Sequence, residues 1–201
     1  MLDADEVAKN KSLRQAIIIV ALANLAYFGI EFAVARHIGS VSLFADSIDF
    51  FEDASVNILI AVALNWSQKL RARVGMAMAL ILLAPALAFV WTVWRKFHSF
   101  AAPEPWLLSG TGLGALVVNL SCAFLLARFQ HHRGSLTRAA FLSARNDAAA
   151  NVAIMLAAAL TMVWTTAWPD LIVGIGIAIL NADAAREIWQ AAKAEHEDAK
   201  P

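Results

Sequence analysis

Residues 40–64 read SVSLFADSIDFFEDASVNILIAVAL, and this stretch decides how the rest of the sequence is interpreted. Its length and its apolar residues fit a helix that crosses the hydrocarbon core of a bilayer, which takes about 20 residues. It also carries four acidic residues, Asp46, Asp49, Glu52 and Asp53. A charged carboxylate at the centre of such a helix costs roughly 2.5–3.5 kcal/mol on insertion scales, so acids at this depth indicate a functional site.

The composition of the whole chain is that of a membrane protein. Of its 201 residues, 60% are hydrophobic and 16% are charged, whereas a soluble domain carries about 25% charged residues. Six apolar segments near spanning length are expected to be helices: Arg14–Ala35, Val41–Asn65, Val74–Trp94, Trp106–Arg128, Ala139–Trp164 and Asp170–Gln190. The expected fold is all-α, a polytopic membrane protein with six transmembrane helices over residues 14–190. Residues 1–13 form a cytoplasmic N-terminal segment in this interpretation, and residues 191–201 a short cytoplasmic tail.

Basic residues in the short connectors predict the orientation, because cytoplasmic loops are enriched in Lys and Arg. One side of the expected bundle holds Lys9, Lys11, Arg14, Lys69, Arg71, Arg73, Arg128, Arg133, Arg138, Lys193 and Lys200. The other side holds only Arg36, Arg95 and Lys96. Both termini are therefore expected in the cytoplasm, with the helices in a bacterial-type inner (plasma) membrane.

Charge balance and cysteine usage narrow the function classes. The chain has 16 basic and 16 acidic residues. This balance does not suggest a nucleic-acid partner, which would require a basic stripe. The single cysteine, Cys122, lies within an apolar run, which excludes an intrachain disulfide and a thiolate-rich metal site.

The acids of the second expected helix fall largely on one face. At about 100° per residue, Asp46, Asp49, Asp53 and Asn57 share a stripe less than a quarter-turn wide. Glu52 points to a neighbouring face. Three carboxylates and an amide therefore line the same wall of the helix.

The fifth expected helix repeats this arrangement. Ser143, Asp147 and Asn151 are spaced four residues apart and stack along one face. If the two stripes face each other, Asp49, Asp53 and Asp147 present carboxylate oxygens to one point, and Ser143 can add a hydroxyl. The pattern predicts a cation site between the second and fifth helices.

Other intramembrane polar residues leave alternatives open. Buried acids can also be protonated, or paired with Arg145, simply to hold helices together. Glu31 fits a supporting contact or a function equally well, and Asn24 and Asn119 are expected to make interhelical hydrogen bonds. Asp170, which follows Pro169, is expected to cap the N-terminus of its own helix.

These residues resemble the cation diffusion facilitator family, whose transmembrane domain has six helices and a metal site between the second and the fifth. The family's lead sequence GS-x-S-L-x-A-D is matched by Gly39, Ser40, Ser42, Leu43, Ala45 and Asp46. Asp49 and Asp53 match the acidic pair that follows, and Asp147 matches the acid of the fifth helix. Ser143 stands where the family usually has histidine. The resemblance runs from about Leu13 to Gln190, and the family's C-terminal cytoplasmic domain is not expected in the about ten residues that follow.

The resemblance implies efflux of a divalent metal cation against inward proton movement. Its implied ligands are Asp49, Asp53, Ser143 and Asp147, with Asp46, Asn57 and Asn151 as supporting or relay residues. Zinc, cobalt or cadmium are the family's usual cargo, whereas a site of oxygen atoms alone favours harder ions such as manganese or ferrous iron. The cation is cargo, so no cofactor is expected. The expected partners are the cation, protons, the lipid bilayer and a second copy of the chain in a homodimer.

Two rival functions are weaker. A passive divalent cation channel needs a continuous polar path. The upper halves of the third and fifth segments are too apolar for one, although a dimer interface could supply it. Membrane phosphotransferases also use Asp-x-x-x-Asp pairs with a divalent ion, but they resemble one another through an upstream Asp-Gly element that this sequence lacks. The chain is therefore expected not to be an enzyme.

Overall fold

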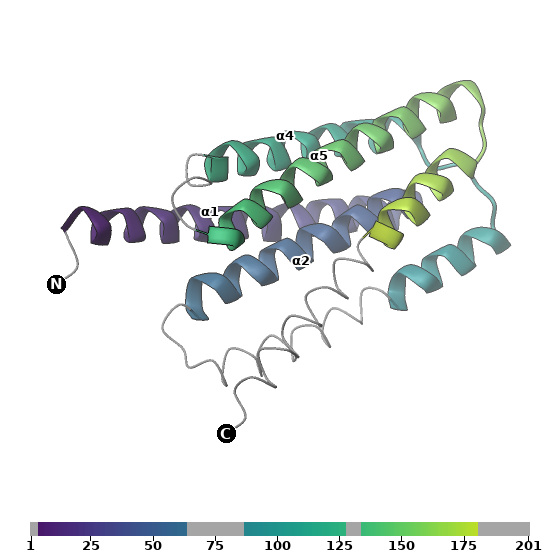
Figure 1. Cartoon of the computed structure of the whole chain (residues 1–201). Coiled ribbons are helices and arrows are strands. Elements are labelled where there is room, and N and C mark those ends of the chain that lie inside the picture. Colours follow the sequence, from purple (N-terminus) through teal and green to yellow (C-terminus); the bar gives the residue numbers. More distant parts are fainter. Residues whose placement is uncertain (1–3, 64–86, 128–133, 181–201) are drawn as a thin grey trace.

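The computed structural model describes residues 4–63, 87–127 and 134–180 (Figure 1). These ranges hold six helical segments and no strand, which confirms the all-α fold with six helices. The segments are α1 (Ala4–Ile38), α2 (Val41–Ala63), residues 87–98, α4 (Pro105–Ala127), α5 (Gly134–Val163) and Trp168–Leu180. The expected helix ends at Asn65, Val74, Arg128 and Gln190 lie outside the described residues.

Two helices begin earlier than the apolar pattern predicts. α1 starts at Ala4 rather than near Arg14, and α5 starts at Gly134 rather than near Ala139. The added stretches contain Ala, Leu, Glu, Lys and Arg, all of which favour helix. Hydropathy marks the part of a helix that fits a bilayer, whereas the helix itself continues until its backbone is terminated.

The helices form an up-and-down bundle in which neighbours along the chain are antiparallel (Figure 1). α1 packs against α2 and α4, α4 packs against α5, and α2 contacts α5. The connections at residues 39–40, 99–104 and 164–167 lie at one end of the bundle, opposite the N-terminus (Figure 1). We call this end, formed by those three connections, the turn end.

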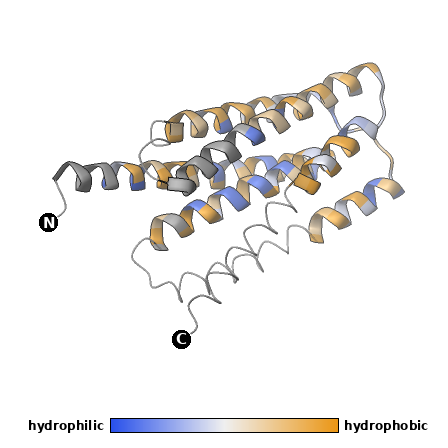
Figure 2. Cartoon of the chain, in the orientation of Figure 1, coloured by the Kyte–Doolittle hydropathy of each residue, from blue (hydrophilic) through white to orange (hydrophobic). Residues whose placement is uncertain are grey.

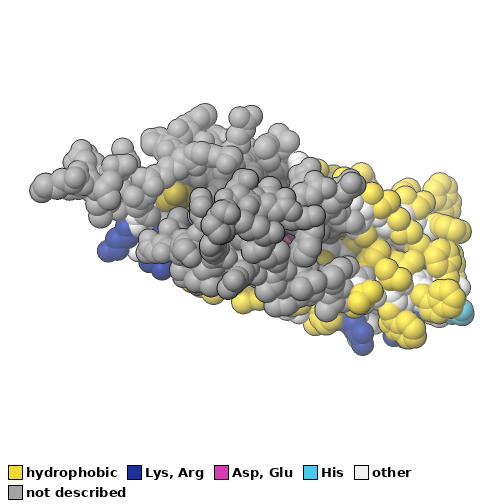
Figure 3. Space-filling model, turned by 60° about the horizontal axis from the view of Figure 1, so that its bottom comes forward, with side chains coloured by type: hydrophobic (Ala, Val, Ile, Leu, Met, Phe, Trp, Pro, Cys, Tyr) yellow, Lys and Arg dark blue, Asp and Glu magenta, His cyan; other side chains and the backbone are white. Residues whose placement is uncertain are grey.

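The outer surface of the bundle is hydrophobic. Side chains such as Phe124, 74% exposed, and Leu156, 61% exposed, point away from the core. Hydrophobic side chains also cover most of the coloured surface in Figure 3. Exposed apolar area on this scale is unfavourable in water. These features indicate an integral membrane protein.

Among the described residues, three helices are long and apolar enough to cross a membrane: Lys11–Ile38, Pro105–Ala127 and Asn146–Val163. Trp168–Leu180 is a shorter apolar helix. α2 has 23 residues, enough to span, but its four acids make it less apolar than these three. The helix that carries the carboxylates therefore depends on its neighbours to shield them from lipid.

A glycine-containing turn joins α1 to α2. Gly39 has φ 63°, in the left-handed region that favours glycine. The Ser40 amide donates to the Ala35 carbonyl at 3.1 Å, the bond that closes a helix C-terminus after such a glycine. The turn reverses the chain within two residues and brings α2 back along α1.

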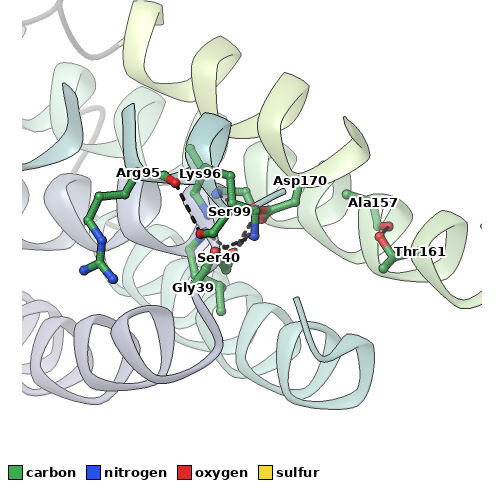
Figure 4. Close-up of polar contacts among 11 residues, drawn as sticks. Gly39, Ser40, Arg95, Lys96, Ser99, Ala157, Thr161 and Asp170 are labelled. Carbon is green, nitrogen blue, oxygen red and sulfur yellow. Dashed lines mark hydrogen bonds and ion pairs between the residues drawn. The ribbon is translucent and has the colours of Figure 1, made fainter. Parts of the chain in front are cut away.

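Asp170 caps α2 from a different helix (Figure 4). Its fully buried carboxylate accepts from the Val41 amide at 2.8 Å and from the Ser42 amide at 3.1 Å. The Ser40 and Ser42 hydroxyls each donate to it at 2.6 Å. Asp170 was expected to cap its own helix, but it satisfies the free N-terminal amides of α2 instead.

Lys96 completes this cluster at the turn end (Figure 4). Its ammonium donates to the Gly39 carbonyl at 2.7 Å and lies 3.9 Å from the Asp170 carboxylate. Burial lowers the pKa of Lys96, and the Asp170 charge acts in the opposite direction. We call Gly39, Ser40, Ser42, Lys96 and Asp170 the turn-end cluster. It joins the α1–α2 connection to the helices of residues 87–98 and Trp168–Leu180 through buried polar contacts.

Gly174 allows the last described helix to approach this cluster closely. A Cβ atom at this position would lie 2.7 Å from the Ser42 amide nitrogen and 2.7 Å from the Val41 carbonyl carbon. Backbone atoms at that distance cannot give way to a side chain. Glycine is therefore needed for Asp170, one helical turn away, to reach the N-terminus of α2.

Candidate metal centre

The acids of α2 lie inside the bundle. Asp46 is fully buried, Glu52 is 9% exposed, and Asp49 and Asp53 are partly buried. Figure 2 shows hydrophilic positions along the inner part of α2 among helices that are otherwise mostly hydrophobic. The carboxylates therefore face protein rather than lipid, as intramembrane acids do in transport sites.

Asp49, Asp53 and Asp147 are brought together. Asp49 lies within electrostatic range of both Asp53 and Asp147. The Asp53 and Asp147 carboxyl groups are close enough to hydrogen-bond, which two carboxyl groups can do only when one carries a proton. Because α2 contacts α5, the polar stripes of these two helices can face each other.

The acids are neighbours but are not arranged as a finished coordination shell. Within the part of the chain that the structure describes, no three His, Cys, Asp or Glu side chains are placed so that they could hold a metal ion directly. Carboxylate side chains on adjacent helix faces can reach a common point by rotating about their side-chain bonds. Direct ligation therefore requires these side chains to rearrange.

Two asparagines flank the acids in matching ways. The Asn57 amide nitrogen donates to the Asp53 carbonyl at 2.8 Å, and that of Asn151 donates to the Asp147 carbonyl at 2.7 Å. The side-chain oxygen of each asparagine is buried and has no hydrogen-bond partner in the described structure. Because α2 and α5 are antiparallel (Figure 1), Asn151 lies toward the turn end and Asn57 toward the other end. Each amide thus leaves a buried oxygen atom without a described hydrogen-bond partner, on a residue one helical turn from Asp53 or Asp147.

Ser143 belongs to α5, one helical turn before Asp147. Its side chain lies outside the described residues. Its role as a ligand therefore stays a prediction from the spacing and from the resemblance.

Helix α1, which the sequence pattern did not place in the site, contributes two buried polar residues. The Asn24 amide donates to the Asp53 carboxylate at 3.4 Å, and the Cys122 thiol donates to the Asn24 oxygen at 3.7 Å. These contacts confirm Asn24 as an interhelical hydrogen-bonding residue. Glu31 is fully buried seven residues, or about two turns, later on the same face. The seven-residue spacing of Asn24 and Glu31 was the signal in the sequence that could have placed α1 in the site.

Glu31 on α1 faces Asp46 on α2. Both side chains are fully buried, and their carboxyl groups are close enough to hydrogen-bond to each other. Apart from this mutual contact, none of their four oxygen atoms has a hydrogen-bond partner in the described structure. Asp46 therefore pairs with α1, separately from the contact between Asp53 and Asp147.

Comparison with known families agrees with this arrangement. The model of the cation efflux transmembrane domain matches residues 17–193, which is most of the chain and includes α2 and α5. A comparison with curated proteins gave no match. A match of this extent, on a helical bundle with a carboxylate-lined interior, shows that the chain belongs to the cation efflux, or cation diffusion facilitator, family of membrane transporters.

Proposed function

We propose that this cation efflux transporter exports a divalent metal ion in exchange for protons, with Asp49, Asp53 and Asp147 as ligands. One observation carries the proposal: carboxyl groups of Asp49 and Asp53 on α2 and of Asp147 on α5 lie within electrostatic range of one another inside the bundle. Like charges held this close repel each other unless a proton or a cation lies between them. A divalent cation can replace the shared proton.

Exchange follows from this competition. A carboxylate must lose its proton to bind metal, so metal binding releases protons and protonation releases metal. If the site opens alternately to the two sides of the membrane, metal binding is favoured on one side and proton binding on the other. An inward proton gradient then drives metal outward.

The donor atoms bear on the identity of the cargo. Three carboxylates, the free side-chain oxygens of Asn57 and Asn151, and the hydroxyl of Ser143 make a set composed only of oxygen. Such a set suits manganese and ferrous iron, whereas family habit favours zinc, cobalt or cadmium. Zinc-type ions are the first cargo to test because the family as a whole transports them.

The function is tested with purified chain in sealed proteoliposomes that contain a pH-sensitive dye. A panel of Zn²⁺, Co²⁺, Cd²⁺, Mn²⁺ and Fe²⁺ is offered with and without a pH gradient, and protein-free liposomes serve as the control. The proposal expects metal to accumulate against its own gradient while protons move the opposite way. Flux that only dissipates a metal gradient would instead support the channel, and turnover of a nucleotide-linked lipid would support the phosphotransferase.

Ser143→His should shift cargo preference toward zinc. Imidazole is a better ligand for zinc than a hydroxyl is, and the substitution restores the residue type usual at this position in the family. The ratio of Zn²⁺ to Mn²⁺ transport is measured in the same proteoliposomes. Ser121→His, on the exposed face of α4, is the matched control and should leave the ratio unchanged. An unchanged ratio in Ser143→His would remove Ser143 from the ligand set.

The orientation and the assembly are part of the same proposal. The basic connectors favour a turn end that faces away from the cytoplasm, in a bacterial-type inner membrane with both termini cytoplasmic. Protons would then approach the site from the turn end. A homodimer is proposed from family membership alone.

A further inference from the structure

The Glu31–Asp46 pair lies between the three proposed ligands and the turn end. Asp46 is three residues before Asp49 on α2, a rise of about 4.5 Å toward the turn end. The pair is thus about one helical turn from the nearest proposed ligand. Beyond it, the turn-end cluster closes the α1–α2 connection with buried hydrogen bonds.

The groups around the pair do not neutralise it. Tyr27 on α1 is the nearby phenol, and its hydroxyl already donates to the Thr111 carbonyl at 2.6 Å. Asp49 on α2 lies within electrostatic range of Glu31, and Asp147 on α5 lies within range of Asp46. Three further titratable groups that the structure describes are held elsewhere. Cys122 of α4 contacts Asn24, and Asp170 and Lys96 are in the turn-end cluster.

Two fully buried carboxyl groups with no other donor have one simple way to satisfy each other, which is to share a proton. A second negative charge at this place would be buried without a partner and would face Asp49 as well. Loss of the proton therefore becomes favourable only when the neighbourhood changes. A divalent cation bound one turn away is such a change, because its charge attracts the carboxylates and repels the proton.

We propose that Glu31 and Asp46 form a proton-binding site, distinct from the metal ligands, that carries a transported proton. The inference rests on the proposed exchange function. When the site opens toward the turn end, a proton from water bonds to one carboxylate oxygen of the pair as metal leaves. When metal binds from the other side, the O–H bond breaks and the proton passes to water on that side.

A purely structural pair would not need an exchangeable proton. Glutamine at position 31 keeps the length of the side chain, and its NH₂ group can donate to Asp46 in place of the shared proton. Glu31→Gln therefore preserves an interhelical hydrogen bond and removes only the titration. The substitution separates proton binding from helix packing.

The test measures protons released when metal binds to the purified protein in detergent, in weak buffer with a pH dye. Zn²⁺ and Mn²⁺ are the probes, and metal affinity is measured on the same samples. Glu31→Gln should bind metal within about threefold of the parent affinity but release about one proton fewer per metal. In proteoliposomes it should lose most of the stimulation by a pH gradient. Glu104→Gln, an exposed acid at the start of α4, is the matched control and should behave as the parent.

An unchanged proton count together with unchanged stimulation by the gradient would overturn the inference. If Glu31→Gln fails to fold, Asp46→Asn removes the same titration from the other partner, and failure of both to fold would mark the pair as structural. The proposed function fails by a different result, namely Asp49→Asn that binds and transports metal like the parent. The two outcomes are therefore distinguishable.

Discussion

Asp49→Asn is expected to abolish metal transport. Asp49 lies within electrostatic range of Asp46, Glu52, Asp53 and Asp147, more acids than surround a carboxylate in an ordinary helix contact. Asparagine keeps the volume but removes the charge that a divalent cation needs. Because even partners that only orient a ligand cost 10–100-fold in metal affinity, loss of a ligand should cost at least on the order of 100-fold. Flux in proteoliposomes and metal binding in detergent measure the two effects.

The same substitution should leave the protein as stable as the parent, or slightly more stable. Removing one acid from a group of like charges relieves repulsion that the empty site carries. Thermal unfolding in detergent checks this, with Glu104→Gln as an acid-to-amide control outside the site. Transport at the parent rate would exclude Asp49 as a ligand. Loss of transport accompanied by a fall in stability would point to a packing role instead.

Asp170→Asn is expected to destabilise the fold strongly. The Asp170 carboxylate accepts four hydrogen bonds from Ser40, Val41 and Ser42 and lies next to Lys96. An asparagine would turn an NH₂ group toward some of these donors and leave the lysine without its counter-charge. Removing one partner of a buried ion pair costs about 3–5 kcal/mol. The free energy of unfolding, measured by denaturant titration in mixed micelles, should fall by that amount.

Glu104→Gln provides a close comparison for this loss. The Glu104 carboxylate also caps a helix, accepting from the Trp106 amide at 3.1 Å and the Leu107 amide at 2.6 Å. It is exposed and caps its own helix, so water can replace the lost contacts. Its substitution should change the unfolding free energy much less than that of Asp170. Equal losses in the two variants would mean that the turn-end cluster is not a special source of stability.

The turn-end cluster also gives a physical reason for part of the lead sequence shared with the family. Gly39 adopts the left-handed conformation, and the Ser40 and Ser42 hydroxyls bind Asp170 from the last described helix. These residues act through the connection between helices, whereas Asp46 acts within the membrane. The lead sequence thus contains the serines that bind the capping residue Asp170 and, in Asp46, the first residue of the polar stripe.

Several features were predictable because they depend on local periodicity. Apolar segments of spanning length predicted the six helices, and the start of α2 at Val41 agrees with the structure. The four-residue spacing of Asp49, Asp53 and Asn57 placed them on one face, since this follows from helical geometry alone. The family could be identified from the same residues.

The partners of those residues depended on how the helices pack. Neither hydropathy nor spacing showed that Asp170 would cap α2 or that Glu31 would face Asp46, because each contact depends on how different helices pack against each other. Helical spacing puts Asn57 on the face of Asp53 and Asn151 on the face of Asp147, but only the structure shows that their nitrogens bond to the backbone and that their oxygens have no described partner. The sequence by itself determined which side chains enter the membrane and on which helix face they lie, since these follow from residue hydrophobicity and the 3.6-residue turn. Only the tertiary structure decided which carboxyl groups lie close to one another, since that depends on side-chain distances between helices.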